Sequence, residues 1–158
     1  MVNILVSACL LGVNCKYNGN NNYNEDVLKL KKYFNIIPVC PEVFGGLPTP
    51  RTPSEICGDR VVSKDGVDVT TAFTDGAEKT LYIAREKNCP AALLKERSPS
   101  CGCGKIYDGS FTSNLVDGNG ITAELLINND ICVFGEGQIN KLLQLCLLYT
   151  SDAADDLI

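Results

Sequence analysis

The chain has 158 residues, 45% of them apolar, and a net charge of −5, which suits one intracellular domain with one core. It has no clustered basic stripe, which excludes the usual footprint of a nucleic-acid binder. No apolar run approaches the roughly 20 residues of a membrane span, and the first residues lack the basic flank of a signal peptide. We therefore expect a cytoplasmic protein without membrane contact.

Strand and helix patterns alternate along the chain. Four short β-rich apolar runs predict buried strands, at residues 2–6, 36–39, 91–94 and 131–134. Four further segments have helical patterns, at residues 25–34, 71–88, 120–128 and 138–145. This alternation predicts an α/β fold with one Rossmann-like open sheet, mostly parallel, and helices on both faces.

Two long loops interrupt this alternation. Residues 41–60 are rich in proline and glycine, and residues 95–104 form the second loop. A long loop in a small domain is more often functional than decorative. Between the first loop and the helix that follows it, residues 60–63 and 67–70 predict a small β-hairpin insertion around residues 64–66.

The last residues differ in character from the rest. Residues 146–156 resemble one reading frame of a transposon adapter used in DNA library preparation. We expect one domain over residues 1–145, followed by a non-native tail over residues 146–158. If the tail is non-native, Cys146 is no candidate ligand, and eight cysteines remain. The alternative is that these residues are an ordinary end of an amphipathic helix.

Nine cysteines and no histidine restrict the chemistry. In a reducing cytoplasm, this cysteine content indicates metal binding or catalysis rather than disulfides. The absence of histidine excludes Ser-His-Asp and Cys-His catalysis and zinc sites that contain histidine.

Three cysteines follow predicted strand ends. Cys9 comes after the first strand, Cys40 ends the second, and Cys101 lies in the loop after the third. The carboxyl ends of parallel strands share one edge, where ligands collect. Thiolates dispersed in this way suit one larger metal centre better than a zinc knuckle; buried, inert thiols are the alternative. Cys15 and Cys103 are reserve ligands.

The other cysteines give weaker signals. Cys132 lies inside a predicted strand and is expected to be a small core residue. Cys57 and Cys89 have no obvious partner in the sequence.

A carboxylate and a hydroxyl accompany the three cysteines. Glu42 follows Cys40 by two residues, and Ser98 precedes Cys101 by three. At the same edge, they could move or relay protons. The alternatives are a solvated loop acid and a turn-forming serine before proline.

Three motifs together resemble the thiouracil desulfidase family. The first comprises residues 6–12, Val-Ser-Ala-Cys-Leu-Leu-Gly, with residues 15–19, Cys-Lys-Tyr-Asn-Gly. The second runs from Pro-Val-Cys-Pro-Glu at residues 38–42 into Gly-Gly-Leu-Pro-Thr-Pro-Arg at residues 45–51. The third is Ser-Pro-Ser-Cys-Gly at residues 98–102. The resemblance covers about residues 1 to 145, although Asn18 stands where the family is expected to have an acid.

The resemblance implies a [4Fe–4S] cluster held by three cysteines, with one iron open to substrate sulfur. Carried over by motif, the ligands are Cys9, Cys40 and Cys101, with Cys15 an alternative in the first motif. The catalytic pair is Glu42 and Ser98. Ser100 lies in the same motif as Ser98 and is the alternative serine.

The implied reaction is non-redox desulfuration of a thiolated pyrimidine, 2-thiouracil to uracil, with release of hydrogen sulfide. The implied partners are this small molecule and the iron–sulfur assembly machinery, without an electron-transfer partner. Two other functions remain open: a non-catalytic iron–sulfur or zinc module that stabilises the fold or senses oxygen, and a metal-independent thiol enzyme that uses Cys101 or Cys103.

Overall fold

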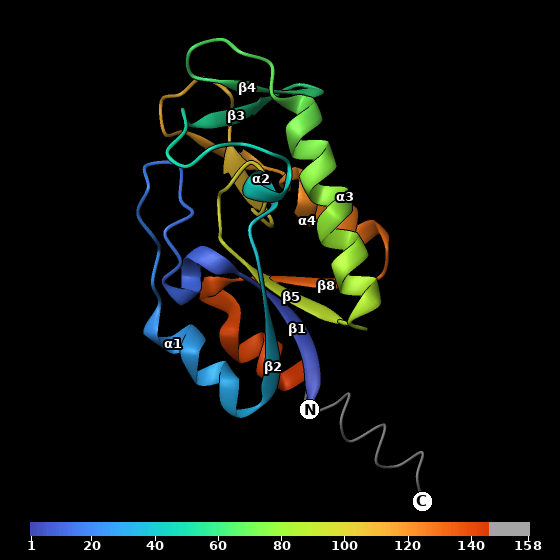
Figure 1. The fold of residues 1–158 in the computed structure, drawn as a ribbon. Coiled ribbons are helices and arrows are strands. Elements are labelled where there is room, and N and C mark those ends of the chain that lie inside the picture. Colours follow the sequence, from blue (N-terminus) through green and yellow to red (C-terminus); the bar gives the residue numbers. More distant parts are fainter. Residues whose placement is uncertain (146–158) are drawn as a thin grey trace, which may run out of the picture.

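The computed structural model describes residues 1–145, and a parallel sheet of four strands forms its centre (Figure 1). Its strands are β1 (Val2–Ser7), β2 (Phe34–Val39), β5 (Ala91–Leu94) and β8 (Cys132–Gly135). They lie in the order β2-β1-β5-β8, and every pairing is parallel. The predicted α/β class and all four predicted strands are confirmed. The predicted tail, with Cys146, lies outside the described residues.

Helices cover both faces of the sheet, as predicted. Leu5 of β1 packs into the same core cluster as residues of α3 (Thr70–Glu86) and α4 (Ile121–Asn128). Its neighbours Ile4 and Val6 belong to the opposite cluster. That cluster also contains residues of α1 (Glu25–Leu28), the 3₁₀ turns η1 (Ala8–Leu11) and η2 (Lys29–Lys32), and the helical residues 139–145. A strand buried on both faces is apolar at successive positions, which is why β1 shows no alternation.

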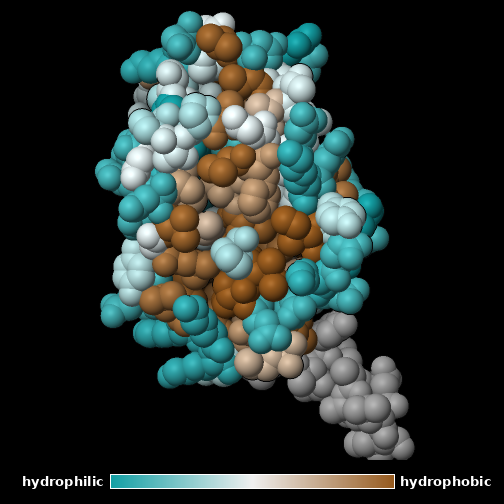
Figure 2. All heavy atoms as spheres, in the orientation of Figure 1, coloured by the Kyte–Doolittle hydropathy of each residue, from teal (hydrophilic) through white to brown (hydrophobic). Residues whose placement is uncertain are grey.

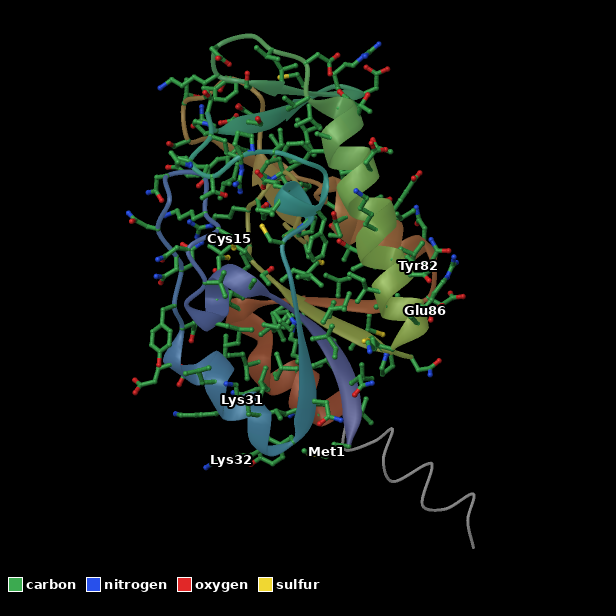
Figure 3. All side chains as sticks on the ribbon, viewed as in Figure 1. Met1, Cys15, Lys31, Lys32, Tyr82 and Glu86 are labelled. Carbon is green, nitrogen blue, oxygen red and sulfur yellow. The ribbon has the colours of Figure 1, made fainter. Side chains whose placement is uncertain are left out.

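The predicted helix over residues 25–34 is shorter than expected. Asn24 caps α1 as predicted, since its side chain accepts hydrogen bonds from the backbone N–H groups of Asp26 and Val27. The helix then tightens into η2 before β2 begins. Figure 3 shows Lys31 and Lys32 of η2 pointing away from the sheet.

The hairpin forms with a different partner strand. β4 (Arg60–Ser63) pairs with β3 (Ser54–Cys57), which lies inside the predicted 41–60 loop. The segment expected to pair with β4 contributes one bridge, between Val62 and Asp68. A two-residue turn that starts with Gly58 at φ 64° joins β3 to β4, and this is a typical hairpin connection. A second hairpin, β6 (Lys105–Tyr107) with β7 (Leu115–Asp117), was not predicted.

The outer surface mixes polar and apolar residues. Figure 2 shows apolar residues gathered over the middle of the face viewed, with polar residues around its margins. Among the described residues, none of the helices combines the length and apolar character that a membrane crossing needs.

Two glycines allow the short helix α2 (Pro41–Phe44) to pack directly on α3. A Cβ atom at Gly76 would lie 1.9 Å from the carbonyl oxygen of Pro41, and one at Gly45 would lie 1.9 Å from that of Ala72. The two backbones are therefore in contact, and this contact positions α2.

Replacing Gly76 by alanine should destabilise the protein, although Gly→Ala in a helix interior ordinarily stabilises by about 1 kcal/mol. The clash is with backbone and cannot relax by side-chain rotation. We expect the free energy of unfolding to fall by about 3 kcal/mol. Urea denaturation measures it, with the exposed Thr74→Ala on the same helix as control. A midpoint equal to that of the wild type would contradict the contact.

Candidate active site

The carboxyl ends of three sheet strands bring three thiols to one cavity. Cys9 lies in η1 directly after β1, Cys40 precedes α2 directly after β2, and Cys101 follows β5 in the next loop. All three line a cavity of about 480 Å³. The structure thus brings together the three cysteines selected from the sequence.

Cys15 joins this group from the loop that follows η1 (Figure 3). Its carbonyl oxygen lies 3.9 Å from the Cys40 sulfur, and its thiol is near enough to those of Cys9 and Cys40 to shift their pKa values. Cys103, the other reserve ligand, instead places its sulfur 3.7 Å from the Val133 carbonyl oxygen. Cys103 is not among the residues of the described chain that line the cavity.

The remaining cysteines lie elsewhere. Cys89 is buried in the core on the α3 face, and the Cys57 sulfur lies 3.5 Å from the Gly109 carbonyl oxygen. The expectation that Cys132 is a core residue is wrong: it is exposed, because it begins the edge strand β8, which has a neighbouring strand on one side only.

The four thiols of the cavity differ in acidity. Hydrogen bonding from Cys15 lowers the pKa of Cys9 to about 7 and that of Cys40 to about 6. The contact with Cys40, and to a smaller extent that with Cys9, raises the pKa of Cys15. Cys15 therefore keeps its proton. Burial raises the pKa of Cys101 to about 12, partly offset by hydrogen bonds from Ser100 and Ser7.

This difference predicts the order of alkylation in cluster-free protein. A thiol becomes a reactive thiolate as the pH rises through its pKa. At pH 7.5, Cys9 and Cys40 should therefore react with iodoacetamide well before Cys101, and before Cys89, whose pKa burial raises to about 11. Time-resolved peptide mass spectrometry measures the order. Equal rates for Cys40 and Cys101 would contradict it.

A carboxylate lies between a guanidinium and a hydroxyl in the same cavity. Glu42 is in the first turn of α2, and its Oε1 lies 3.0 Å from Nε of Arg51. Its Oε2 accepts a hydrogen bond of 3.1 Å from the Ser100 hydroxyl. Arg51 is itself fixed, because it also donates to the Cys15 carbonyl oxygen at 2.8 Å. The Glu42 carboxylate therefore has one orientation relative to the thiols.

The two serines of the third motif form a chain that ends at Glu42. Ser98 Oγ accepts from the backbone N–H groups of Ser100 and Cys101, both at 3.1 Å. It lies 3.0 Å from Ser100 Oγ. With two N–H donors already on Ser98 Oγ, its own proton is available to Ser100, whose proton points to Glu42. The arrangement can carry a proton between the cavity and the carboxylate.

Sequence reasoning missed the roles of Arg51 and Ser7. Arg51 is the last residue of the second motif, but nothing in that motif indicates that it contacts Glu42. Ser7 is buried at the end of β1, where its hydroxyl accepts from the Lys95 N–H at 2.9 Å and reaches the Cys101 thiol. A serine at the end of an apolar strand carries no such signal.

The donor set fits a metal cluster. The thiols come from separate elements and surround a cavity. Among the described residues, no three His, Cys, Asp or Glu side chains are close enough together to hold a single metal ion. A cluster takes one thiolate on each of several irons, so its ligands can stand apart. Cys9, Cys40 and Cys101, with Cys15 beside two of them, are the residues that could hold one.

Comparison with known proteins shows which family the chain belongs to. The family model for 2-thiouracil desulfurase matches residues 4–138. The protein YbbK of Bacillus subtilis (strain 168) is 42% identical over 150 residues, which cover 89% of this chain and 99% of YbbK. The solved structure of the [4Fe-4S]-dependent thiouracil desulfidase TudS superposes with a TM-score of 0.89 at 42% identity, covering 94% of this chain and 99% of that one. The chain belongs to the 2-thiouracil desulfurase family.

Proposed function

We propose that this protein removes sulfur from a thiolated pyrimidine, converting 2-thiouracil to uracil with release of hydrogen sulfide. The observation that carries the proposal is the single cavity, in which three strand-end thiols stand beside the fixed carboxylate of Glu42. Membership of the family supports the same reaction.

Cys9, Cys40 and Cys101 would hold a [4Fe–4S] cluster at this edge of the sheet. When bound by three thiolates, such a cluster has one iron without a protein ligand, which supplies a Lewis acid for a soft sulfur atom. The hydroxyl of Ser7 would donate to the Cys101 sulfur, while the Ser100 proton stays on the side of Glu42. Such hydrogen bonds to ligand sulfurs tune a cluster.

The reaction needs an attacking water molecule and proton transfers, and side chains of the protein would activate the water and carry the protons. Glu42 would accept a proton from the water that attacks the thiocarbonyl carbon, and Arg51 would hold the carboxylate in place. Ser98 would position the reacting groups and exchange its proton with Glu42 through Ser100. The C–S bond breaks as a C=O bond forms, so thiocarbonyl and water give carbonyl and hydrogen sulfide. No electron is transferred overall.

We place the protein in the cytoplasm, where iron–sulfur assembly machinery would supply the cluster. A reducing compartment keeps cysteine thiols available to a metal. Within residues 1–145, no disulfide joins any of the eight cysteines.

The direct test is an anaerobic assay of the reconstituted protein. Protein with bound iron and sulfide should convert 2-thiouracil to uracil and release one sulfide per turnover. Apoprotein prepared with a chelator is the control and should be inactive. Turnover by the apoprotein would indicate a thiol enzyme, and a full cluster without turnover would indicate a structural or sensing module.

The serine chain predicts a non-additive pair of substitutions. Ser98→Ala and Ser100→Ala should each lower kcat by about 100-fold, because either one interrupts the same proton path. The double variant should be no slower than the slower single variant. Single-turnover rates at equal iron content provide the measurement. Losses that multiply in the double variant would show that the two hydroxyls act independently.

A further inference from the structure

The loop over residues 108–113 forms one wall of the cavity. Phe111 and Ser113 line the cavity from this loop, and Tyr107 lines it from the adjoining strand β6. The backbone of Phe111 is left-handed, with φ 58°. A bulky residue seldom adopts this conformation and keeps it only where its surroundings impose it.

Glu55 of β3 imposes that conformation. Its side chain is buried, and its Oε1 accepts hydrogen bonds from the backbone N–H groups of Gly109 at 2.9 Å and Phe111 at 3.2 Å. Hydrogen bonds to a carboxylate are stronger than those between neutral groups. Glu55 therefore holds both ends of a three-residue segment with one oxygen atom.

The loop is also pressed against β3 at Gly109. A Cβ atom there would lie 2.8 Å from the Ile56 carbonyl oxygen and 3.1 Å from the Cys57 sulfur. This close approach is independent of the Glu55 hydrogen bonds. It shows that the loop is docked on the hairpin rather than extended into solvent.

We propose that Glu55 is a positioning residue that holds Phe111 as an aromatic wall of the cavity, against which the flat ring of the substrate packs. The inference rests on the proposed function, since it assumes a planar thiolated pyrimidine. An aromatic side chain offers such a ring a π face without requiring a hydrogen bond. Glu55 itself lines the cavity, but its carboxylate hydrogen bonds go to the backbone of Gly109 and Phe111, so we expect its effect on binding of the ring and not on the cluster.

The test compares Glu55→Met, which keeps the volume but loses the acceptor, with Glu55→Gln, which keeps an acceptor oxygen. With 2-thiouracil, Glu55→Met should raise KM about tenfold and leave kcat within about twofold, at unchanged iron content. Glu55→Gln should stay within about threefold of the wild-type KM. Glu86→Ala, at an exposed position of α3 labelled in Figure 3, is the control for loss of a carboxylate and should change neither constant.

A double-mutant cycle with Phe111→Ala separates positioning from a general structural role. If Glu55 acts through Phe111, then Phe111→Ala should raise KM by a similar factor, and Glu55→Met should add nothing in that background. Equal effects of Glu55→Met in both backgrounds, or a wild-type KM in either single variant, would overturn the inference. Phe111→Ala tests the wall even if Glu55→Met does not fold.

Amide hydrogen exchange tests the clamp without any substrate. Glu55→Met should speed the exchange of the Gly109 and Phe111 amides relative to Glu55→Gln, and unchanged exchange would overturn the clamp. Wild-type protein with a full cluster and no turnover of 2-thiouracil would overturn the proposed function instead. An active wild type whose KM does not respond to Glu55→Met overturns only the inference about the wall.

Discussion

Glu42→Gln should lower kcat by about 1,000-fold while iron and sulfide content stay at wild-type levels. The amide keeps the size of the side chain and can still accept from Ser100, but it cannot take a proton from water. The Arg51 partner loses a charge-assisted hydrogen bond at 3.0 Å, while its contact with the Cys15 carbonyl oxygen holds it near its place. The loss should therefore appear in kcat and leave KM almost unchanged.

Single-turnover kinetics and metal analysis on the same sample provide this measurement. Glu124→Gln is the matched control, since Glu124 also accepts a side-chain hydrogen bond, from Asn119, but is not among the described residues that line the cavity. It should keep wild-type kcat. A Glu42→Gln variant with a full cluster and at least half the wild-type kcat would exclude Glu42 as the base.

The sequence predicted the centre of the sheet well because its inner strands, β1 and β5, are buried on both faces. The apolar run at residues 91–94 lies between Pro90 and the charged pair Lys95-Glu96, and β5 has the bounds that this run predicts. The hairpins were harder to predict, because β3 begins directly after Pro53 in a segment whose composition is typical of a loop. Its pairing depends on the buried side chains of Glu55 and Val61, which composition does not reveal.

The site could be predicted as a set of residues but not as a network. Cys9, Cys40 and Cys101 follow strand ends, and parallel topology alone brings strand ends to one edge. Which serine contacts Glu42 depends on the turn at Pro99, which places the Ser100 hydroxyl on the carboxylate and the Ser98 hydroxyl on two backbone N–H groups. Arg51 lies nine residues after Glu42, and the loop between them folds back so that the two side chains meet. The spacing of the two residues in the sequence does not predict that contact.

The second large effect concerns which thiols hold the cluster. Cys9→Ala, Cys40→Ala and Cys101→Ala should each lose the cluster and, with it, all turnover of 2-thiouracil. Each removes a thiolate from a separate strand end, and two remaining ligands cannot retain a cluster that needs three. Cys15→Ala should retain iron and sulfide, because its thiol contacts those of Cys9 and Cys40 without occupying a strand end of its own.

Iron and acid-labile sulfide per chain, together with turnover at equal protein concentration, measure the whole series. The exposed Cys132→Ala is the control for loss of a thiol and should match the wild type in every measurement. A cluster lost in all four variants of the cavity would mean that Cys15 is a fourth ligand, leaving no open iron and favouring a sensor over an enzyme. Retention of a full cluster and full activity by Cys9→Ala would overturn the ligand set, because the neighbouring Cys15 would then be the thiol that supplies the third ligand.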